Sequence, residues 1–312
     1  MVQIDVSVII VCMNNLSMLF QCLESIIQNT HKVSYEVFVV AYLFSEDNLA
    51  LLKAKHPTVI IIESNEIRGF SENNNLALKE ASGTYCLILN DDTYFDIPLI
   101  DSLVDSFHKQ TDADFFSPVI YDNQGIACGR PPEDFISFLL YHVLRIKYIR
   151  KKNRQYVDQQ GIFQTYNISG CCFIVKTEVL KELGYFNEQY FFCPEDIELS
   201  TIANAQGKKC YLNSSLILHH KQGSTFSMTS TATFPAMYKG FQHFYSKIFQ
   251  IPKVSISFIL LFSLIKFWIF WSLQLTENGK INRKRYSNAI VALFLDKTPK
   301  EVFIEYFRKI KK

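Results

Sequence analysis

The chain has 312 residues, of which 48% are hydrophobic, and its formal net charge at pH 7 is +2. This length suits one large domain or one domain with an appendage, and the apolar content is enough to form a sizeable core. The near balance of charges gives no general reason to expect nucleic-acid binding, which requires a basic face.

The first 90 residues alternate between apolar runs and helical patterns. Continuous apolar runs predict buried strands at 5–13, 35–42, 58–62 and 84–89. The segments between them predict helices at 16–28, 46–55 and 71–81. Strands that alternate with helices indicate βαβ units, so we predict an α/β fold with a mostly parallel sheet flanked by helices.

The pattern becomes less regular after residue 93. It predicts a helix at 98–107 and a loop at 125–134, followed by a strongly basic run at 145–154. A second patterned block spans 161–224, and from about residue 230 the pattern is helical and rich in aromatic residues. We therefore predict a first domain at 1–228 and a C-terminal helical region at 229–312.

One segment of the C-terminal region is long and apolar enough to cross a bilayer. Residues 254–275 carry a single charge, Lys266, which is costly near the middle of a spanning helix. Basic residues follow at 280–285. An interfacial helix in contact with a membrane surface, a buried core helix and a membrane span all remain open at this point.

The start of the chain has neither a basic n-region nor a small-residue cleavage site, so we expect no signal peptide. The eight cysteines contain no CxxC pair, and their scatter predicts reduced, buried thiols. We expect a cytoplasmic protein, located at the inner face of the cell membrane if 254–275 contacts lipid.

Acidic residues occur directly after the strand predicted at 84–89, in the segment Asn90-Asp91-Asp92. Ligands of open α/β sheets bind beyond the carboxyl ends of the strands. Adjacent carboxylates repel each other, and a hard cation such as Mg²⁺ would offset that repulsion. A polar turn or a helix N-cap is the ordinary alternative for this segment.

A second acidic segment, Glu195-Asp196, follows the aromatic stretch 190–194. A carboxylate beside an apolar wall can act as a general base near neutral pH. The ordinary alternative is a helix start, where acidic side chains are favoured by the helix dipole. Two further segments are candidates for ligand contacts, namely His219-His220 and Arg68-Gly69-Phe70 with the asparagines that follow it. The ordinary alternative for both is a solvated loop or a helix cap.

Taken in order, these segments resemble the family 2 glycosyltransferases, which have a GT-A fold, and particularly their bacterial rhamnosyltransferase-like members. The resemblance covers about Val6 to Ser224. It rests on Asn14-Asn15 after the first strand, Gly69-Phe70 with Asn74-Asn75, Leu89 to Thr93, Gly170, Gly184 to Glu188, Glu195-Asp196, and His219 five residues before Ser224.

The resemblance implies a role for each matched residue. Asp92 and His219 would contact a Mg²⁺ or Mn²⁺ ion, and Asp196 would be the catalytic base. The donor side would consist of Asn14, Asn15, Gly69, Phe70, Asn74, Asn75, Asn90 and Asp91. The acceptor would be bound by Gly170, Tyr185 and Glu195.

The implied reaction moves a sugar, with inversion, from a nucleotide-diphosphate donor to a saccharide or lipid-linked saccharide. Thymidine diphosphate rhamnose or a uridine diphosphate sugar would be the donor, in cell-surface polysaccharide synthesis. Departures from the family pattern at Met13 and Ala41 keep a non-catalytic nucleotide-sugar or carbohydrate-binding protein open as the alternative. A nucleotidyltransferase is disfavoured, because residues 12–17 contain neither glycine nor lysine.

Overall fold

The computed structural model describes residues 3–122, 125–127, 129, 131–144, 159–221 and 224–310. The chain divides into two compact units. Of the described residues, the first unit contains those up to 132, 159–187 and 196–221, and the second contains 133–144, 188–195 and 224–310. The sequence pattern indicated a single boundary near residue 228 and did not group 133–144 and 188–195 with the C-terminal helices. The basic run 145–154 lies outside the described residues.

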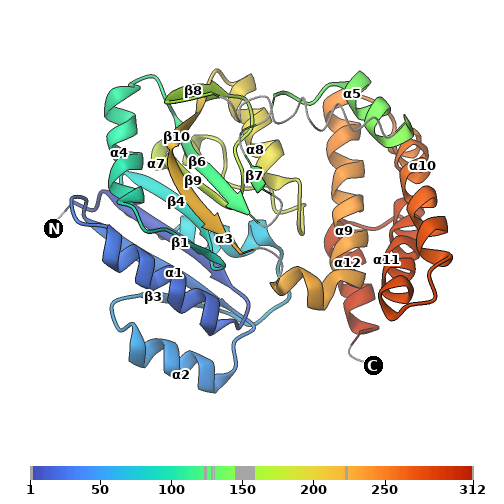
Figure 1. Cartoon of the computed structure of the whole chain (residues 1–312), viewed down its shortest axis with the longest axis horizontal. Helices are drawn as coiled ribbons and strands as arrows, with labels where there is room; N and C mark the ends of the chain where they lie inside the picture. The colour runs from blue at the N-terminus through green and yellow to red at the C-terminus, as the bar shows by residue number, and fades with distance from the viewer. Residues whose placement is uncertain are drawn as a thin grey trace. The chain divides into compact units, whose positions relative to one another are not determined.

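The first unit is built on one sheet with the strand order β3-β2-β1-β4-β9-β6-β10-β5 (Figure 1), with β7 paired to β6 and β8 to β10. The strands are β1 (Val6–Cys12), β2 (Tyr35–Tyr42), β3 (Ile60–Ser64), β4 (Tyr85–Asn90), β5 (Thr93–Tyr94), β6 (Phe115–Asp122), β7 (Gly125–Ala127), β8 (Ile162–Thr165), β9 (Cys172–Lys176) and β10 (Cys210–His220). The first four strands of this order run parallel, whereas β9 is antiparallel to both β4 and β6. The predicted α/β fold is thus confirmed.

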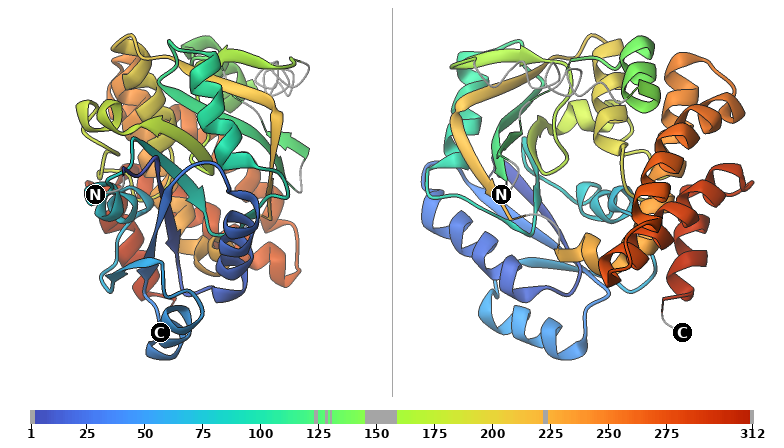
Figure 2. Two further views of the ribbon diagram at one scale, coloured as in Figure 1. Left: turned by 90° about the vertical axis from the view of Figure 1, so that its left-hand side faces the viewer. Right: turned by 45° about the vertical axis from the view of Figure 1, so that its right-hand side comes forward.

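Helices cover both faces of the sheet (Figure 2). On one face α1 (Leu16–Asn29) and α4 (Leu99–Lys109) pack on Val8 and Ile10 of β1. On the other face α3 (Phe70–Leu78), α7 (Thr177–Glu182) and α8 (Glu195–Ala205) pack on Ile9 of β1. Because successive strand residues point to opposite faces, a strand covered on both sides is apolar throughout, as the sequence of β1 is.

Several sequence-predicted elements differ from the structure, and the helix predicted at 71–81 is α3 at Phe70–Leu78. The strand predicted at 58–62 is β3 at Ile60–Ser64. The segment predicted as a loop at 125–134 contains β7, which pairs antiparallel with Ile120–Asp122 of β6. The pairing of β9 with β6 ends at Phe116, so the outer part of β6 has an open edge that β7 occupies.

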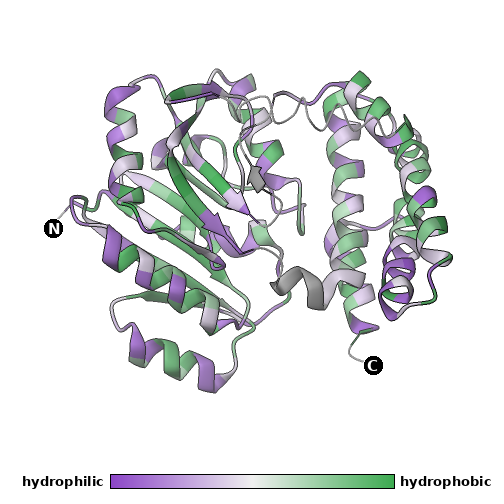
Figure 3. Cartoon of the chain, in the orientation of Figure 1, coloured by the Kyte–Doolittle hydropathy of each residue, from purple (hydrophilic) through white to green (hydrophobic). Residues whose placement is uncertain are grey.

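The second unit is helical. It contains α5 (Phe135–Leu139), the π-helical turn η1 (Leu140–Leu144), α9 (Ser224–Phe249), α10 (Lys253–Ser272), α11 (Glu277–Phe294) and α12 (Pro299–Arg308). Among the described residues, α10 alone is long and apolar enough to cross a membrane, on length and composition only. Hydrophobic residues predominate along it (Figure 3), and many of them are exposed.

His56 gives the first unit a pH-dependent stability. His56 caps the C-terminus of helix α2 (Glu46–Lys55) and is buried, and among the described residues its Nε2 has no hydrogen-bond partner. Burial lowers the pKa of His56, and the positive charge of Lys55 lowers it further. The unfolded chain therefore takes up a proton more readily than the folded protein, so stability is complete above pH ~6.5 and falls as the pH drops below it.

The variant His56→Phe is expected to lose part of this pH dependence, because it removes the proton that only the unfolded chain accepts. The measurement is the thermal midpoint followed from neutral pH to about pH 5, the range over which a histidine of unperturbed pKa titrates. The control is His31→Phe at an exposed position. Parallel curves for wild type and His56→Phe would contradict the role of His56.

Candidate functional site

The ends of β1 and β4 define one edge of the sheet in the first unit. These strands are parallel, and Val11 lies opposite Asn90, so their carboxyl ends lie side by side. Asp91 and Asp92 follow β4 directly at this edge. Open α/β sheets bind ligands at such edges, and the two carboxylates therefore occupy the expected position of a ligand site.

Asp92 is paired with His220, which is the last residue of strand β10. Its Oδ1 lies 3.1 Å from Nε2 of His220, and the two side chains are 12% and 14% exposed. Strand β10 brings His220 there, because its last residues pair with β5, which puts His220 opposite Thr93. The backbone N–H of Lys221 donates to the carbonyl of Asp92 at 2.9 Å, which fixes the two segments together.

Asp91 is held over the buried thiol of Cys12 at the end of β1. Burial raises the pKa of Asp91 to about 7, and the charge of Asp92 raises it further, while the hydrogen bond from Cys12 lowers it. Burial and the nearby Asp91 both raise the pKa of the Cys12 thiol, which therefore stays protonated, and its Sγ donates to the carbonyl of Asn15 at 3.5 Å. Two neighbouring carboxylates thus share a poorly solvated position, where a cation would offset their repulsion.

The donor set fits a divalent cation held partly by its substrate. Across the described residues, no group of three or more His, Cys, Asp and Glu side chains is arranged to hold a metal ion. Mg²⁺ characteristically binds through one or two carboxylates together with water and substrate phosphates, and Mn²⁺ favours the same oxygen ligands. The carboxylates of Asp91 and Asp92, with the imidazole of His220 beside them, meet that requirement.

His219, the metal contact that the sequence pattern suggested, is placed differently. Its ring stacks on Tyr94 with centroids 4.9 Å apart and an interplanar angle of 15°. It also meets the ring of Tyr121 edge-on. Successive residues of a strand point to opposite faces, so only one of the two histidines can face Asp92, and that residue is His220. The family resemblance favoured His219, and nothing in the sequence pattern indicated His220.

Asp196 lies at the same edge of the sheet. It belongs to α8, and its Oδ2 accepts from the backbone N–H of Gly170 at 2.9 Å, while Oδ1 accepts from Ile197 N at 2.8 Å. Gly170 immediately precedes Cys171, whose carbonyl accepts from the N–H of Asn90 at 3.0 Å. A Cβ at position 170 would lie 3.3 Å from Cβ of Asp196, so glycine permits this close approach. The two acidic segments therefore converge beside the end of β4.

Asn14 joins two loops at the same end of the sheet. Its backbone adopts a positive φ of 54°. Its Oδ1 accepts from the N–H of Ser45 at 3.0 Å and from Nδ2 of Asn48 at 2.9 Å. Asn15 follows as the residue that precedes α1. The side chain of Asn14 thereby connects the loop after β1 to the start of α2.

The other donor-side candidates lie at the start of α3. Gly69 precedes the helix, and its N–H donates to the carboxylate of Glu72 at 3.0 Å. The Phe70 ring packs edge-on against Phe186 at 5.8 Å. Asn74 is buried and donates from Nδ2 to the carbonyl of Phe70 at 2.9 Å.

Asn75 connects α3 to the turn that contains Tyr185. Its Nδ2 donates to the carbonyl of Phe186 at 2.9 Å, and its Oδ1 accepts from the N–H of the same residue at 3.1 Å. Tyr185 has a positive φ of 65°, and Gly184 before it has a φ of 79°. The buried amide of Asn75 therefore holds a turn whose backbone is unusual for a tyrosine.

Replacing Asn75 with alanine is expected to destabilise the protein by about 2–4 kcal/mol, because both backbone groups of Phe186 would lose their buried partner. The measurement is the midpoint of urea unfolding. Asn74→Ala is the matched control, and its loss of one hydrogen bond within the helix is expected to cost about 1 kcal/mol. Equal effects of the two substitutions would contradict the role assigned to Asn75.

The acceptor candidates do not all belong to the same unit. Gly170 and Tyr185 lie in the first unit, whereas Glu195, the buried first residue of α8, is grouped with the second. Sequence reasoning did not single out Glu198, which is buried and accepts from Nδ2 of Asn187 at 2.8 Å. An acidic residue two positions after Asp196 was the signal that the sequence offered for it.

Residues 7–184 match the family model described as glycosyl transferase family 2. The chain belongs to this family. Among its relatives, an O-antigen biosynthesis protein of Myxococcus xanthus is 25% identical over 239 residues, which are 70% of this chain and 17% of that protein. An N-acetylglucosaminyl-diphospho-decaprenol L-rhamnosyltransferase of Mycobacterium tuberculosis is 26% identical over 148 residues, 45% of this chain and 48% of that protein.

The chain thus spans less than half of the length of either relative. The rhamnosyltransferase match confirms the sequence resemblance to that branch of family 2. Among solved structures, a mannosyltransferase from Pyrobaculum calidifontis in complex with GDP-Man and Mn²⁺ has a TM-score of 0.54 at 16% identity. That alignment covers 93% of this chain and 86% of the mannosyltransferase, and it confirms the fold.

Proposed function

We propose that this family 2 chain is an inverting glycosyltransferase. It moves a sugar from a nucleotide-diphosphate donor to a saccharide or lipid-linked saccharide in cell-surface polysaccharide synthesis. The observation that carries this proposal is the convergence of two acidic segments at one sheet edge, Asp91-Asp92 after β4 and Asp196 against Gly170. The relatives named for O-antigen synthesis and rhamnosyl transfer support the substrate class.

Asp92 and Asp91 would hold a Mg²⁺ or Mn²⁺ ion together with the donor diphosphate, with His220 beside them. A divalent ion bound there supplies Lewis-acid stabilisation of the charge that develops on the leaving diphosphate. His220 keeps the Asp92 carboxylate oriented through the 3.1 Å contact. The match to a mannosyltransferase solved with Mn²⁺ supports this choice of cation.

Asp196 takes the proton of the acceptor hydroxyl. The N–H groups of Gly170 and Ile197 each donate to one of its oxygens, which orients the carboxylate. The deprotonated hydroxyl then attacks the anomeric carbon from the face opposite the diphosphate. This single displacement inverts the configuration and requires no covalent sugar–enzyme intermediate.

The donor-side contacts would come from Asn14 and Asn15 after β1 and from Gly69-Phe70 at the start of α3. Within α3, Asn74 donates to the carbonyl of Phe70, and Asn75 holds the turn at Phe186. Thymidine diphosphate rhamnose is the first donor to test and a uridine diphosphate sugar the second. The enzyme would work in the cytoplasm at the inner face of the membrane, with the C-terminal region 229–312 in contact with it.

The test is a panel of nucleotide sugars, each added with and without Mn²⁺ while the thermal midpoint is followed. We expect one donor to raise the midpoint only when the metal is present, because metal and diphosphate bind together. Transfer of that donor's sugar to a lipid-linked saccharide is then measured by mass. Stabilisation by a nucleotide sugar without any donor hydrolysis or sugar transfer would indicate a binding protein instead of an enzyme.

The two adjacent histidines are expected to respond differently to substitution. His220→Gln removes the partner of Asp92 and should lower metal-dependent turnover by about tenfold to 100-fold, as the loss of groups that orient metal ligands does. His219→Gln removes only the ring contacts with Tyr94 and Tyr121 and should leave turnover within a few-fold of wild type. Initial rates over a series of Mn²⁺ concentrations distinguish the two. A larger loss in His219→Gln would reassign the metal contact to His219.

A further inference from the structure

The second unit contains a cavity of about 370 Å³ at the point where α9, α10 and α12 meet. Small-molecule sites typically occupy a few hundred Å³ or more. Its walls are formed by Gln189, Lys239, Gln242, His243, Lys253, Asp296, Lys297, Thr298, Pro299 and Glu301. Every residue that lines the cavity belongs to the second unit, whereas the acidic edge of the sheet belongs to the first.

Two lysines give the cavity a positive character. Lys239 is only 9% exposed, and its Nζ donates to the carbonyl of Leu295 at 2.6 Å. Burial lowers the pKa of Lys239, and the nearby charge of Lys253 lowers it further, while Asp296 opposes the effect. An ammonium group in this position gains from an anionic partner, since such a partner offsets both the burial and the repulsion.

The other charges at the cavity are already engaged. Lys297 binds Glu305 at 2.7 Å. The carboxylate of Glu301 accepts from the N–H of Thr298 at 2.8 Å in the cap of α12. Asp296 is then the remaining carboxylate beside Lys239 and Lys253 among the lining residues. The two lysines Lys239 and Lys253 are opposed by the single carboxylate of Asp296, so the cavity favours a ligand with at least one negative charge.

An exposed apolar stripe begins at the rim of the cavity. Val254 follows the lining residue Lys253, and the stripe continues along one face of α10 with Phe258, Phe262, Ile265 and Ile269, all exposed. Residues at this spacing share one side of a helix. The opposite side, with Ile256, Leu260 and Leu264, is buried. From Val254 to Ile269 the stripe is about 22 Å long at 1.5 Å per residue.

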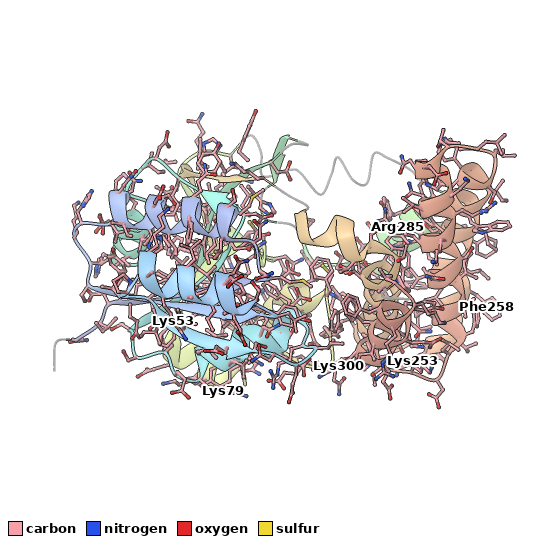
Figure 4. All side chains as sticks on the ribbon, turned by 90° about the horizontal axis from the view of Figure 1, so that it is seen from below. Lys53, Lys79, Lys253, Phe258, Arg285 and Lys300 are labelled. Carbon is pink, nitrogen blue, oxygen red and sulfur yellow. The ribbon has the colours of Figure 1, made fainter. Side chains whose placement is uncertain are left out.

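Helix α11 extends the apolar surface toward the cavity. Phe294 at its end packs edge-on against Phe258, with ring centroids 5.7 Å apart, and the two side chains are 50% and 53% exposed. Phe294 precedes the lining residue Asp296 by two positions. Figure 4 shows the side chains of Lys253 and Phe258 on these C-terminal helices.

We propose that the cavity and the stripe together bind one amphiphile, a lipid whose phosphate or diphosphate headgroup lies against Lys239 and Lys253. Its long hydrocarbon chain lies along the exposed face of α10. A basic cavity continuous with an apolar strip is complementary to such a molecule in both charge and polarity. This inference rests on the proposed function, because a lipid-linked diphosphate acceptor has this chemistry.

The test is co-sedimentation of the full chain with phosphatidylcholine vesicles that contain polyprenyl phosphate, with polyprenol vesicles for comparison. We expect binding only to the phosphate-containing vesicles. Lys253→Glu and Phe258→Glu should each weaken it by about tenfold or more, the effect of losing a charge-assisted contact or a buried apolar group. Lys309→Glu, at the opposite end of α12, is the matched charge control and should bind as wild type does.

Inorganic pyrophosphate distinguishes a lipid headgroup from a free anion. If it raises the thermal midpoint while Phe258→Glu binds the vesicles normally, the cavity takes free anions and the lipid assignment is overturned. The proposed site would be overturned if Lys309→Glu and Lys253→Glu lost vesicle binding equally. It would also be overturned if wild type bound polyprenol vesicles as well as it binds polyprenyl phosphate vesicles. Lys253→Gln provides a second test if Lys253→Glu does not fold.

The vesicle assay does not depend on the glycosyltransferase reaction. Metal-dependent stabilisation by a nucleotide sugar should be unchanged in Lys253→Glu, because the acidic edge belongs to the other unit. If wild type binds the phosphate-containing vesicles but never a nucleotide sugar, the lipid site stands and the proposed enzymatic function fails. If donor binding is normal and vesicle binding is absent, the lipid site alone is contradicted.

Discussion

Asp92→Asn is expected to abolish the stabilisation of this protein by a nucleotide sugar in the presence of Mn²⁺. The substitution removes one of two adjacent carboxylates at the end of β4, and a neutral amide is a far weaker ligand for a hard cation. The expected loss in turnover is at least about 100-fold, more than results when only a group that orients a metal ligand is removed. The measurements are the donor-dependent thermal midpoint and the initial rate over a range of Mn²⁺ concentrations.

The fold of this variant should be preserved. The amide oxygen of asparagine can still accept from His220, which keeps the 3.1 Å contact. The midpoint without ligand is therefore expected to remain close to that of wild type. Asp105→Asn, a carboxylate on the exposed surface of α4, is the control for the general loss of a charge. Normal Mn²⁺-dependent donor binding by Asp92→Asn would remove Asp92 from the metal site.

Asp196→Asn is expected to bind the donor normally and to lose transfer to the acceptor. Asparagine has nearly the same shape but cannot take up the hydroxyl proton, so turnover should fall by about 10²–10⁴-fold, the usual contribution of a general base. The measurement is the rate of sugar transfer at saturating donor, combined with donor affinity from thermal shifts. We expect the donor affinity of the variant to match that of wild type, whereas its rate of sugar transfer is lost.

The contacts of Asp196 allow a structural effect to be recognised. Both of its oxygens accept backbone N–H groups, so the amide nitrogen of the variant would oppose one of them, at Gly170 or Ile197. The resulting strain should lower the thermal midpoint without altering donor affinity. The variant Gly170→Ala displaces the carboxylate without removing it and should lower turnover less than Asp196→Asn does. Wild-type turnover from Asp196→Asn would exclude Asp196 as the base.

The two acidic segments differ in how the fold holds them. Asp91 and Asp92 are placed by a parallel strand in the middle of the sheet, and any side chain after β4 would reach the same edge. Asp196 reaches it from a helix, and its place depends on the contact with Gly170 before the antiparallel strand β9. The position of Asp196 is consequently more sensitive to changes in the loop before β9.

The sequence determined the order of the elements and the location of the acidic edge. The uninterrupted apolar pattern of β1, β2 and β4 indicates burial on both faces, which only helices on both sides of a parallel sheet provide. The alternation of those strands with helices then fixes where their carboxyl ends meet. The amino-acid pattern therefore places Asp91 and Asp92 at that edge, whereas their proposed role in a ligand site comes from the family resemblance.

The tertiary structure decided which side chains meet at that edge. His219 and His220 are indistinguishable in composition, and the choice of His220 depends on the register of β10 against β5. The cavity beside Lys239 likewise arises from α9, α10 and α12, whose packing is set by contacts between distant segments. Sequence patterns report which face of an element is buried, whereas the identity of its neighbour depends on register and packing across the whole fold.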